Sequence, residues 1–276
     1  MQLVVVTGAS SGIGRATALR YAKAGWRVIA MARTRSALEE LQKEAGALNG
    51  NGGVVVVAVD AGDGAAAHAA CANVVAEFGV PDVVVNSAGL GSWKYLDETS
   101  PKELSQMMGA PFFAAAHVTG AFLSGMIARG SGRILHVGSP ASIQPWPGSA
   151  AYAMSRWALR GLHESLRTDL WGSGVSTSHV VFGEVTSAYF DNNPGSHEHI
   201  PRVARIIPLS TPEQCADTLF RLGSSSSAPP AEVYEPFMLR ILLWVRTLAP
   251  GLFRASVVAT GRKREKLLPT PKSTTP

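Results

Sequence analysis

Two side chains near the middle of the chain have the types and the spacing for proton-transfer chemistry. Tyr152 and Arg156 are four residues apart, and a helix brings side chains at that spacing onto one face. A positioned tyrosine can donate or accept a proton during a reaction. A cation beside it favours the ionised form of its phenol. The pair therefore offers an acid/base group with a charged neighbour, provided that the surrounding elements hold it at a cavity.

The elements that must position this pair follow an alternating pattern. Apolar runs alternate with helical segments from the first residue, and the run 54–59 is apolar at every position, as in a strand covered on both faces. We predict strands at 3–6, 28–31, 54–59, 82–85, 133–137 and 176–181, and helices at 13–24, 36–45, 65–78, 103–128 and 152–170. This alternation predicts one α/β domain, a Rossmann-like doubly wound parallel sheet with helices on both faces. Ligands of such sheets bind beyond the carboxyl ends of the strands.

A glycine-rich turn joins the first predicted strand to the first predicted helix. Gly8, Gly12 and Gly14 follow the pattern TGxxxGxG, and glycine lets the backbone approach a pyrophosphate closely. The start of the following helix supplies N–H groups and a partial positive charge. The turn therefore predicts a dinucleotide site. The alternative is an ordinary strand–helix turn that contains glycines.

The end of the second predicted strand indicates which dinucleotide is bound. A site for NAD places an acidic residue there to hold the ribose 2′-hydroxyl, whereas this chain has no acid from Ala30 to Arg33. A guanidinium matches the geometry of a phosphate. Arg33, with Arg15 adding positive charge, therefore predicts NADP(H). In the alternative interpretation, Arg33 and Arg35 are merely solvated.

Taken together, these features resemble the short-chain dehydrogenase/reductase family over roughly residues 3–190. The marks are the glycine turn, the segment 86–89, and Ser139 thirteen residues before Tyr152. The resemblance implies hydride transfer with a carbonyl or alcohol substrate, in which Tyr152 is the acid/base, Ser139 holds the substrate oxygen, and Arg156 is the cation that also bonds the nicotinamide ribose. The cofactor-binding residues that it implies are Gly8, Ser10, Ser11, Gly12, Ile13, Gly14, Arg33, Asp60, Ala61, Asn86, Ala88, Gly89, Tyr152, Arg156 and Thr186.

Two positions depart from the family pattern, and both belong to its proton relay. The family has lysine where this chain has Arg156, and a guanidinium does not readily pass protons onward as an ammonium can. The family also has an asparagine, which anchors a water, where this chain has Pro111, a residue that bends helices and frees the carbonyl of Met107. We expect an oxidoreductase with a modified relay. The alternative is a catalytically impaired nucleotide-binding protein that acts as a regulator or partner.

Composition and charge restrict the other classes of function. The chain has 276 residues, of which 46% are hydrophobic and 16% charged, as in a globular protein. Of the net charge of +5, the segment 262–276 carries +4, and we expect this segment to be a disordered basic tail. The rest of the chain carries only +1, so we expect no nucleic-acid partner. Two cysteines and scattered histidines indicate no metal site.

The last third of the chain indicates how a substrate is enclosed. The segment 237–248 is apolar except at Arg240 and Arg246 and a threonine near its end. We expect this segment to close the substrate pocket or a subunit interface. It would belong to a lid region at about 188–255, within a single domain at 1–261. An apolar lid suits a lipophilic substrate. The alternative is contact of this helix and the basic tail with a membrane surface, since no apolar run is long enough to span one. We expect the protein to be a cytoplasmic homo-oligomer. In the alternative interpretation, it is bound peripherally at a membrane surface.

Overall fold

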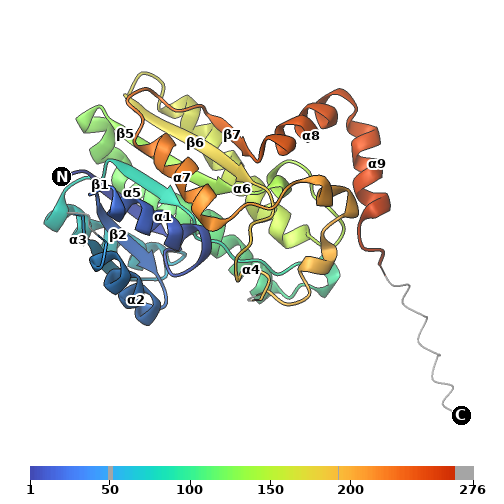
Figure 1. The fold of residues 1–276 in the computed structure, drawn as a ribbon, viewed down its shortest axis with the longest axis horizontal. Coiled ribbons are helices and arrows are strands. Elements are labelled where there is room, and N and C mark those ends of the chain that lie inside the picture. Colours follow the sequence, from blue (N-terminus) through green and yellow to red (C-terminus); the bar gives the residue numbers. More distant parts are fainter. Residues whose placement is uncertain (49–51, 192, 265–276) are drawn as a thin grey trace, which may run out of the picture.

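Seven parallel strands form one sheet at the centre of the molecule (Figure 1). The structure is a computed structural model that describes residues 1–48, 52–191 and 193–264. The strands are β1 (Leu3–Thr7), β2 (Arg27–Ala32), β3 (Val54–Ala58), β4 (Val83–Asn86), β5 (Gly132–Gly138), β6 (Val175–Phe182) and β7 (Glu232–Glu235). Their order in the sheet is β3-β2-β1-β4-β5-β6-β7, and every neighbouring pair is parallel. The predicted Rossmann-like doubly wound sheet is confirmed.

Helices cover both faces of this sheet. One layer consists of α1 (Gly12–Lys23), α2 (Arg35–Gly46) and α7 (Pro212–Gly223). The other layer consists of α3 (Gly64–Phe78), α5 (Ala114–Arg129) and α6 (Ala150–Asp169). Successive side chains of a strand point to opposite faces, so Val4 and Val6 of β1 pack on the first layer and Val5 packs on the second. Because all strands run in one direction, the loops that follow them meet at one edge of the sheet.

The long helix predicted at 103–128 changes its winding at Pro111. It begins as α4 (Pro101–Met108), passes through a π-helical turn (Gly109–Phe113) and continues as α5. Proline has no N–H to donate to the carbonyl of Met107, and a π-helical turn accommodates such a break in the ladder. The departure at Pro111 therefore appears in the structure as a wider turn of the helix.

The helical stretch Pro101–Arg129 is long and apolar enough to cross a membrane, with a mean hydropathy of 1.4 in its most apolar window. From the sequence we expect no segment long enough to span a membrane, so this stretch is a correction. Val118, Phe122 and Met126 of α5 are nevertheless buried against the sheet and α3. These contacts are those of a core helix, and its composition reflects that burial.

The last third of the chain contains elements that were not predicted. Both α7 and β7 are additions, and the segment 188–208, at the start of the expected lid region, contains two short 3-10 helices, His197–His199 and Arg202–Ile206. The predicted apolar helix is α8 (Phe237–Leu248), which is followed at a bend of 119° by α9 (Pro250–Thr260). Figure 1 shows α8 and α9 outside the two helical layers, on the side of the molecule away from the N-terminus. Most of the predicted basic tail, residues 265–276, lies outside the described residues.

Candidate active site

The glycine turn brings two segments of backbone into close contact at the start of α1. Gly8 has a φ of +67°, which favours glycine, and a Cβ there would lie 2.8 Å from the Cα of Ala88. A Cβ on Gly14 would collide with the carbonyl oxygen of Gly8. The first turn of α1 contains no acidic residue, and Ser11, at its N-cap, makes no side-chain cap. The N-terminal end of α1 is therefore open to an anionic ligand.

Arg33 lies directly after β2 and lines a cavity that starts at the glycine turn. Arg15 is expected to add positive charge to this site, but the Arg15 guanidinium pairs with Glu44 of α2 and does not line the cavity. Arg35 lies 3.8 Å from Glu39 on the surface of α2. Of these three arginines, Arg33 is the one that faces the cavity.

The cavity has a volume of about 1370 Å³ and extends along the carboxyl edge of the sheet. The predicted site residues that line it are Gly8, Ser10, Ser11, Gly12, Ile13, Gly14, Arg33, Asp60, Ala61, Ala88, Gly89, Ser139, Tyr152 and Arg156. Asn86 and Thr186 do not line it. Thr186 is exposed, and its hydroxyl donates to the Ser210 carbonyl at 3.2 Å. The cavity thus joins the glycine turn to the three residues assigned to catalysis.

Asn86 faces the protein interior rather than the cavity. Its amide donates to the Thr119 hydroxyl of α5 at 2.9 Å and lies 3.3 Å from Nδ1 of His136 in β5. These contacts connect β4 to its neighbours and position the loop that carries Ala88 and Gly89. The expectation that Asn86 contacts a cofactor directly is therefore corrected. Its side chain instead supports the loop that lines the cavity.

Three histidines are buried behind the site, on β5, α6 and β6. Burial lowers the pKa of His136 to about 3, of His163 to about 4 and of His179 to about 2, and the nearby His163 adds to the effect on His136 and on His179. All three are therefore neutral near pH 7.

Tyr152 and Arg156 lie on one face of α6. The guanidinium carbon of Arg156 lies 5.1 Å from the centre of the Tyr152 ring, and its Nη1 donates to the Val137 carbonyl at 3.0 Å. Gly89 makes room for this side chain, because a Cβ there would lie 2.8 Å from Nη2. Tyr152 is only 5% exposed and Arg156 only 6%. The two side chains therefore lie together in a site from which most water is excluded.

Ser139 follows β5 at the same edge of the sheet. It begins the short 3-10 helix Pro140–Ser142, where its Oγ accepts a hydrogen bond from the Ala141 N–H at 3.3 Å. The side chain is buried apart from its contact with the cavity. A hydroxyl that accepts in this way keeps its proton for donation, so Ser139 can donate a hydrogen bond to a substrate oxygen.

An aromatic wall, which the sequence analysis did not identify, surrounds Tyr152. The ring of Trp93 lies 5.2 Å from that of Tyr152, 5.1 Å from Trp146 and 5.6 Å from Phe190, measured between ring centres. With Tyr189, these residues line the cavity. They come from separate loops after β4, β5 and β6, so no local spacing indicated them. The wall gives the reaction site a largely apolar boundary.

Tyr189 is a second phenol beside Tyr152. Burial raises the pKa of Tyr189 well above its usual value, and the nearby Tyr152 adds to this effect while Arg156 opposes it. Its hydroxyl lies directly over Gly91, where any Cβ would collide with it. Tyr189 therefore stays protonated near pH 7 and can donate a hydrogen bond, but it is poorly suited to act as a base.

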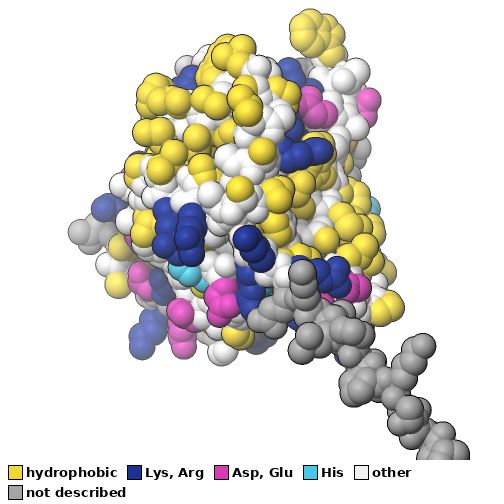
Figure 2. Space-filling model, turned by 90° about the vertical axis from the view of Figure 1, so that its right-hand side faces the viewer, with side chains coloured by type: hydrophobic (Ala, Val, Ile, Leu, Met, Phe, Trp, Pro, Cys, Tyr) yellow, Lys and Arg dark blue, Asp and Glu magenta, His cyan; other side chains and the backbone are white. Residues whose placement is uncertain are grey.

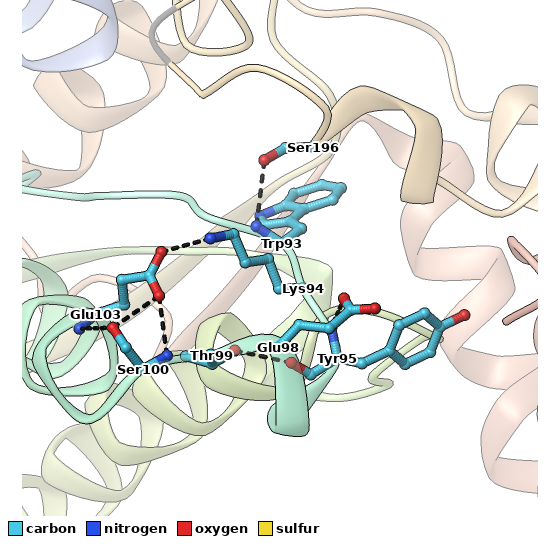
Figure 3. A network of polar contacts seen from close by, with 8 residues as sticks. All are labelled: Trp93, Lys94, Tyr95, Glu98, Thr99, Ser100, Glu103 and Ser196. Atoms are coloured by element: carbon cyan, nitrogen blue, oxygen red, sulfur yellow. Dashed lines mark hydrogen bonds and ion pairs between the residues drawn. The ribbon is translucent and has the colours of Figure 1, made fainter. Parts of the chain in front are cut away.

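Trp93 is held in place by a network at the start of α4 (Figure 3). Its backbone N–H donates to the Ser196 hydroxyl at 3.3 Å, which ties the loop after β4 to the segment after β6. Lys94 donates to Glu103 at 2.5 Å, and the Ser100 N–H donates to the same carboxylate at 2.9 Å. These bonds lower the pKa of Glu103 to about 2. The network thus orders two of the three loops that build the aromatic wall, those after β4 and β6.

The end of the cavity beyond the wall is apolar. Its lining includes Ile200 and Ile207 from the segment after β6, Leu239 and Leu243 from α8, and Phe253 from α9. The region predicted as a lid therefore contributes side chains to the cavity. This end offers space for hydrocarbon and few groups that could hydrogen-bond to a polar substrate.

Comparison with known proteins identifies the family. The sequence model of the family described as short chain dehydrogenase matches residues 2–196, well over half of the chain. The chain belongs to the short-chain dehydrogenase family. The bovine dehydrogenase/reductase SDR family member 7B is 28% identical over 271 residues, which is 96% of this chain and 82% of the relative. The NADP-dependent 3-hydroxy acid dehydrogenase YdfG of Escherichia coli strain K12 is 30% identical over 191 residues, which is 69% of this chain and 75% of the relative.

Solved structures of the family share the fold of this short-chain dehydrogenase. The alcohol dehydrogenase of the archaeon Thermococcus sibiricus, complexed with 5-hydroxy-NADP, matches with a TM-score of 0.74 and 26% identity over 85% of this chain and 95% of the other. A metagenomic short-chain oxidoreductase in complex with NADP matches with a TM-score of 0.71 and 31% identity over 84% and 96%. The predicted family is confirmed, and with it the broad class of oxidoreductase.

Proposed function

We propose that this short-chain dehydrogenase uses NADP(H) to reduce a lipophilic ketone or aldehyde, or to oxidise the corresponding secondary alcohol. The observation that carries the proposal is the one cavity that joins the glycine turn to Tyr152, Ser139 and Arg156. The NADP dependence of a relative and the NADP complexes of two solved structures support the choice of cofactor.

The residues along the cavity fit a dinucleotide phosphate. Gly8 and Gly14 allow the close backbone packing that shapes the glycine turn, and the uncapped start of α1 can accept the charge of a pyrophosphate. Arg33 offers a guanidinium to a 2′-phosphate, and Asp60 and Ala61 line the adjoining space, where the family resemblance places the adenine ring. When bound, NADP(H) would supply or accept the hydride.

The side chains of the protein would handle the substrate oxygen and its proton. Ser139 would donate a hydrogen bond to this oxygen, and Tyr152 would give it a proton during reduction or remove one during oxidation. Arg156 would stabilise the tyrosinate, because it lies 5.1 Å from the ring. Since a guanidinium keeps its own protons, Arg156 would stabilise charge without returning the proton, which must reach Tyr152 from solvent by another route.

The proposed reaction is tested by following the consumption of NADPH and NADH with a panel of ketones and aldehydes. We expect turnover with NADPH, and a kcat/KM at least about tenfold higher for lipophilic carbonyls than for small hydrophilic ones, because a few methylenes buried in an apolar pocket contribute this much. Faster reaction of the hydrophilic carbonyls would contradict the lipophilic assignment. Tight NADPH binding without turnover on any carbonyl would favour the nucleotide-binding alternative.

The proposed cofactor specificity depends on Arg33. We expect Arg33→Ala to raise the KM for NADPH about 10–100-fold, because charge-assisted hydrogen bonds to a phosphate contribute about 1.5–3 kcal/mol, and to leave the KM for NADH nearly unchanged. Arg35→Ala is the matched control, because Arg35 lies beside Glu39 outside the cavity. Initial-rate kinetics with both cofactors measure the effect, and equal losses with NADPH and NADH would refute a role in 2′-phosphate binding.

A further inference from the structure

The outer faces of α8 and the start of α9 form an exposed apolar surface. Phe237, Ile241, Trp244 and Leu248 recur at helical spacing along α8 and are 65%, 41%, 69% and 79% exposed, and Leu252 of α9 is 77% exposed. We call these five residues the α8–α9 surface. Figure 2 shows hydrophobic side chains gathered on this side of the molecule, with Lys and Arg side chains beside them. A contiguous apolar patch of this kind marks a binding surface.

The inner faces of the same helices line the cavity. Leu239, Leu242 and Leu243 of α8 and Phe253 and Val257 of α9 are part of its lining. The helix α8 is therefore apolar on opposite sides. A helix that is hydrophobic all round is ordinarily buried, which indicates that an apolar environment also covers its outer side.

The charged residues of the segment that carries this surface are all positive. The segment 237–264 contains six Lys and Arg residues and no Asp or Glu. Two of the six, near its end, pair with acidic residues of other loops. Arg240 and Arg254 are exposed, and neither forms an ion pair within the described part of the chain. An exposed apolar stripe flanked by such cations complements a lipid surface that carries negative charge.

The dimensions of the pair suit a helix hairpin that lies along a membrane. α8 has 12 residues and α9 has 11, so at about 1.5 Å per residue neither helix can cross a hydrocarbon core of about 30 Å. The bend of 119° also prevents the pair from acting as one straight span. We propose that the α8–α9 surface docks on the surface of an anionic lipid bilayer.

A second copy of the chain fits this surface less well. In a two-fold dimer the same patch meets itself, so both copies would bring the cations Arg240 and Arg254 into one interface with no acidic residue of the segment 237–264 to balance them. Like charges at an interface core oppose association. Anionic lipid head groups, in contrast, neutralise these side chains.

Docking would place the apolar end of the cavity close to the bilayer, because only α8 and α9 would lie between them. A lipophilic substrate dissolved in the membrane could then enter beside these helices without crossing water; this consequence rests on the proposed function. Docking itself does not rest on the proposed function, because lipid binding needs neither cofactor nor substrate. Failure of one proposal is therefore distinguishable from failure of the other.

The test is sedimentation of the full chain with vesicles of phosphatidylcholine alone or mixed with phosphatidylserine. We expect the wild type to sediment with the mixed vesicles, and the double variant Trp244→Ser/Leu248→Ser to bind at least about tenfold more weakly, because two large apolar side chains no longer enter the lipid. Arg240→Gln/Arg254→Gln should bind about tenfold more weakly to the mixed vesicles only. Trp171→Ser is the matched control, because Trp171 is 91% exposed and precedes β6 at the opposite edge of the sheet.

Three results would overturn the proposal. The first is equal sedimentation of the wild type and Trp244→Ser/Leu248→Ser. The second is binding that survives in this variant but is lost when residues 265–276 are removed, which would assign lipid binding to the tail. The third is that the wild type does not bind vesicles, and that the same double variant loses the wild-type oligomeric state, measured by light scattering. An unchanged circular-dichroism spectrum confirms that each variant is folded.

Discussion

Tyr152→Phe is expected to lower kcat by about 10²–10⁴-fold, the usual contribution of a positioned general acid or base. The substitution removes the hydroxyl but keeps the ring, which packs 5.2 Å from Trp93 between ring centres. The aromatic wall and the glycine turn should therefore persist, and the Kd for NADPH should stay close to that of the wild type. Steady-state kinetics give kcat, and quenching of protein fluorescence by NADPH gives the Kd.

Tyr189→Phe provides the comparison for this experiment, because it removes a second buried phenol from the same cavity. We expect a loss of less than about tenfold, since a neutral hydrogen bond contributes about 1 kcal/mol. Retained turnover in Tyr152→Phe would remove Tyr152 from its assigned role. A large loss in Tyr189→Phe together with retained turnover in Tyr152→Phe would transfer the proton-donor role to Tyr189.

The fold was predictable wherever burial left a simple pattern in the sequence. The central strands are apolar on both faces and were found within about two residues of their observed ends. In contrast, β7 is a half-buried edge strand, with glutamates at both of its ends, so it lacks such a run. The sequence does contain a signal for the start of α7, since Thr211 and Gln214 form a capping box and Pro212 follows the N-cap. That signal was not used in the prediction.

The site was predictable only where function depends on local spacing. The glycine turn and the Tyr152–Arg156 pair each lie within one turn or one helix, and the structure brings them to one cavity. Side-chain partners from distant segments could not be read from spacing. Arg15 finds Glu44 on another helix, and Asn86 turns to its neighbours in the core. The aromatic wall likewise exists only after three loops meet.

Arg156→Met is expected to lower kcat about 100-fold while leaving the fold intact. The guanidinium lies 5.1 Å from the Tyr152 ring in a nearly buried site, where a charge at about 5 Å and an effective dielectric constant near 20 contributes about 3 kcal/mol. Each 1.36 kcal/mol is about a tenfold change in rate. Methionine keeps most of the side-chain volume and removes the charge. The measurement is kcat, with the circular-dichroism spectrum as the control for folding, because Arg156 is also expected to bond the nicotinamide ribose; an unchanged kcat would show that the cation has no role in the reaction.

Arg156→Lys then separates charge from shape. Lysine restores the cation and can pass a proton onward, and it removes the buried Nε of Arg156, which has no hydrogen-bond partner among the described residues. The smaller head group fits beside Gly89, so we expect kcat above that of the wild type. A large loss would have a different meaning. It would show that the site has been rebuilt around the guanidinium, through its hydrogen bond to Val137 and its close packing on Gly89, and that proton resupply follows a route that does not use residue 156.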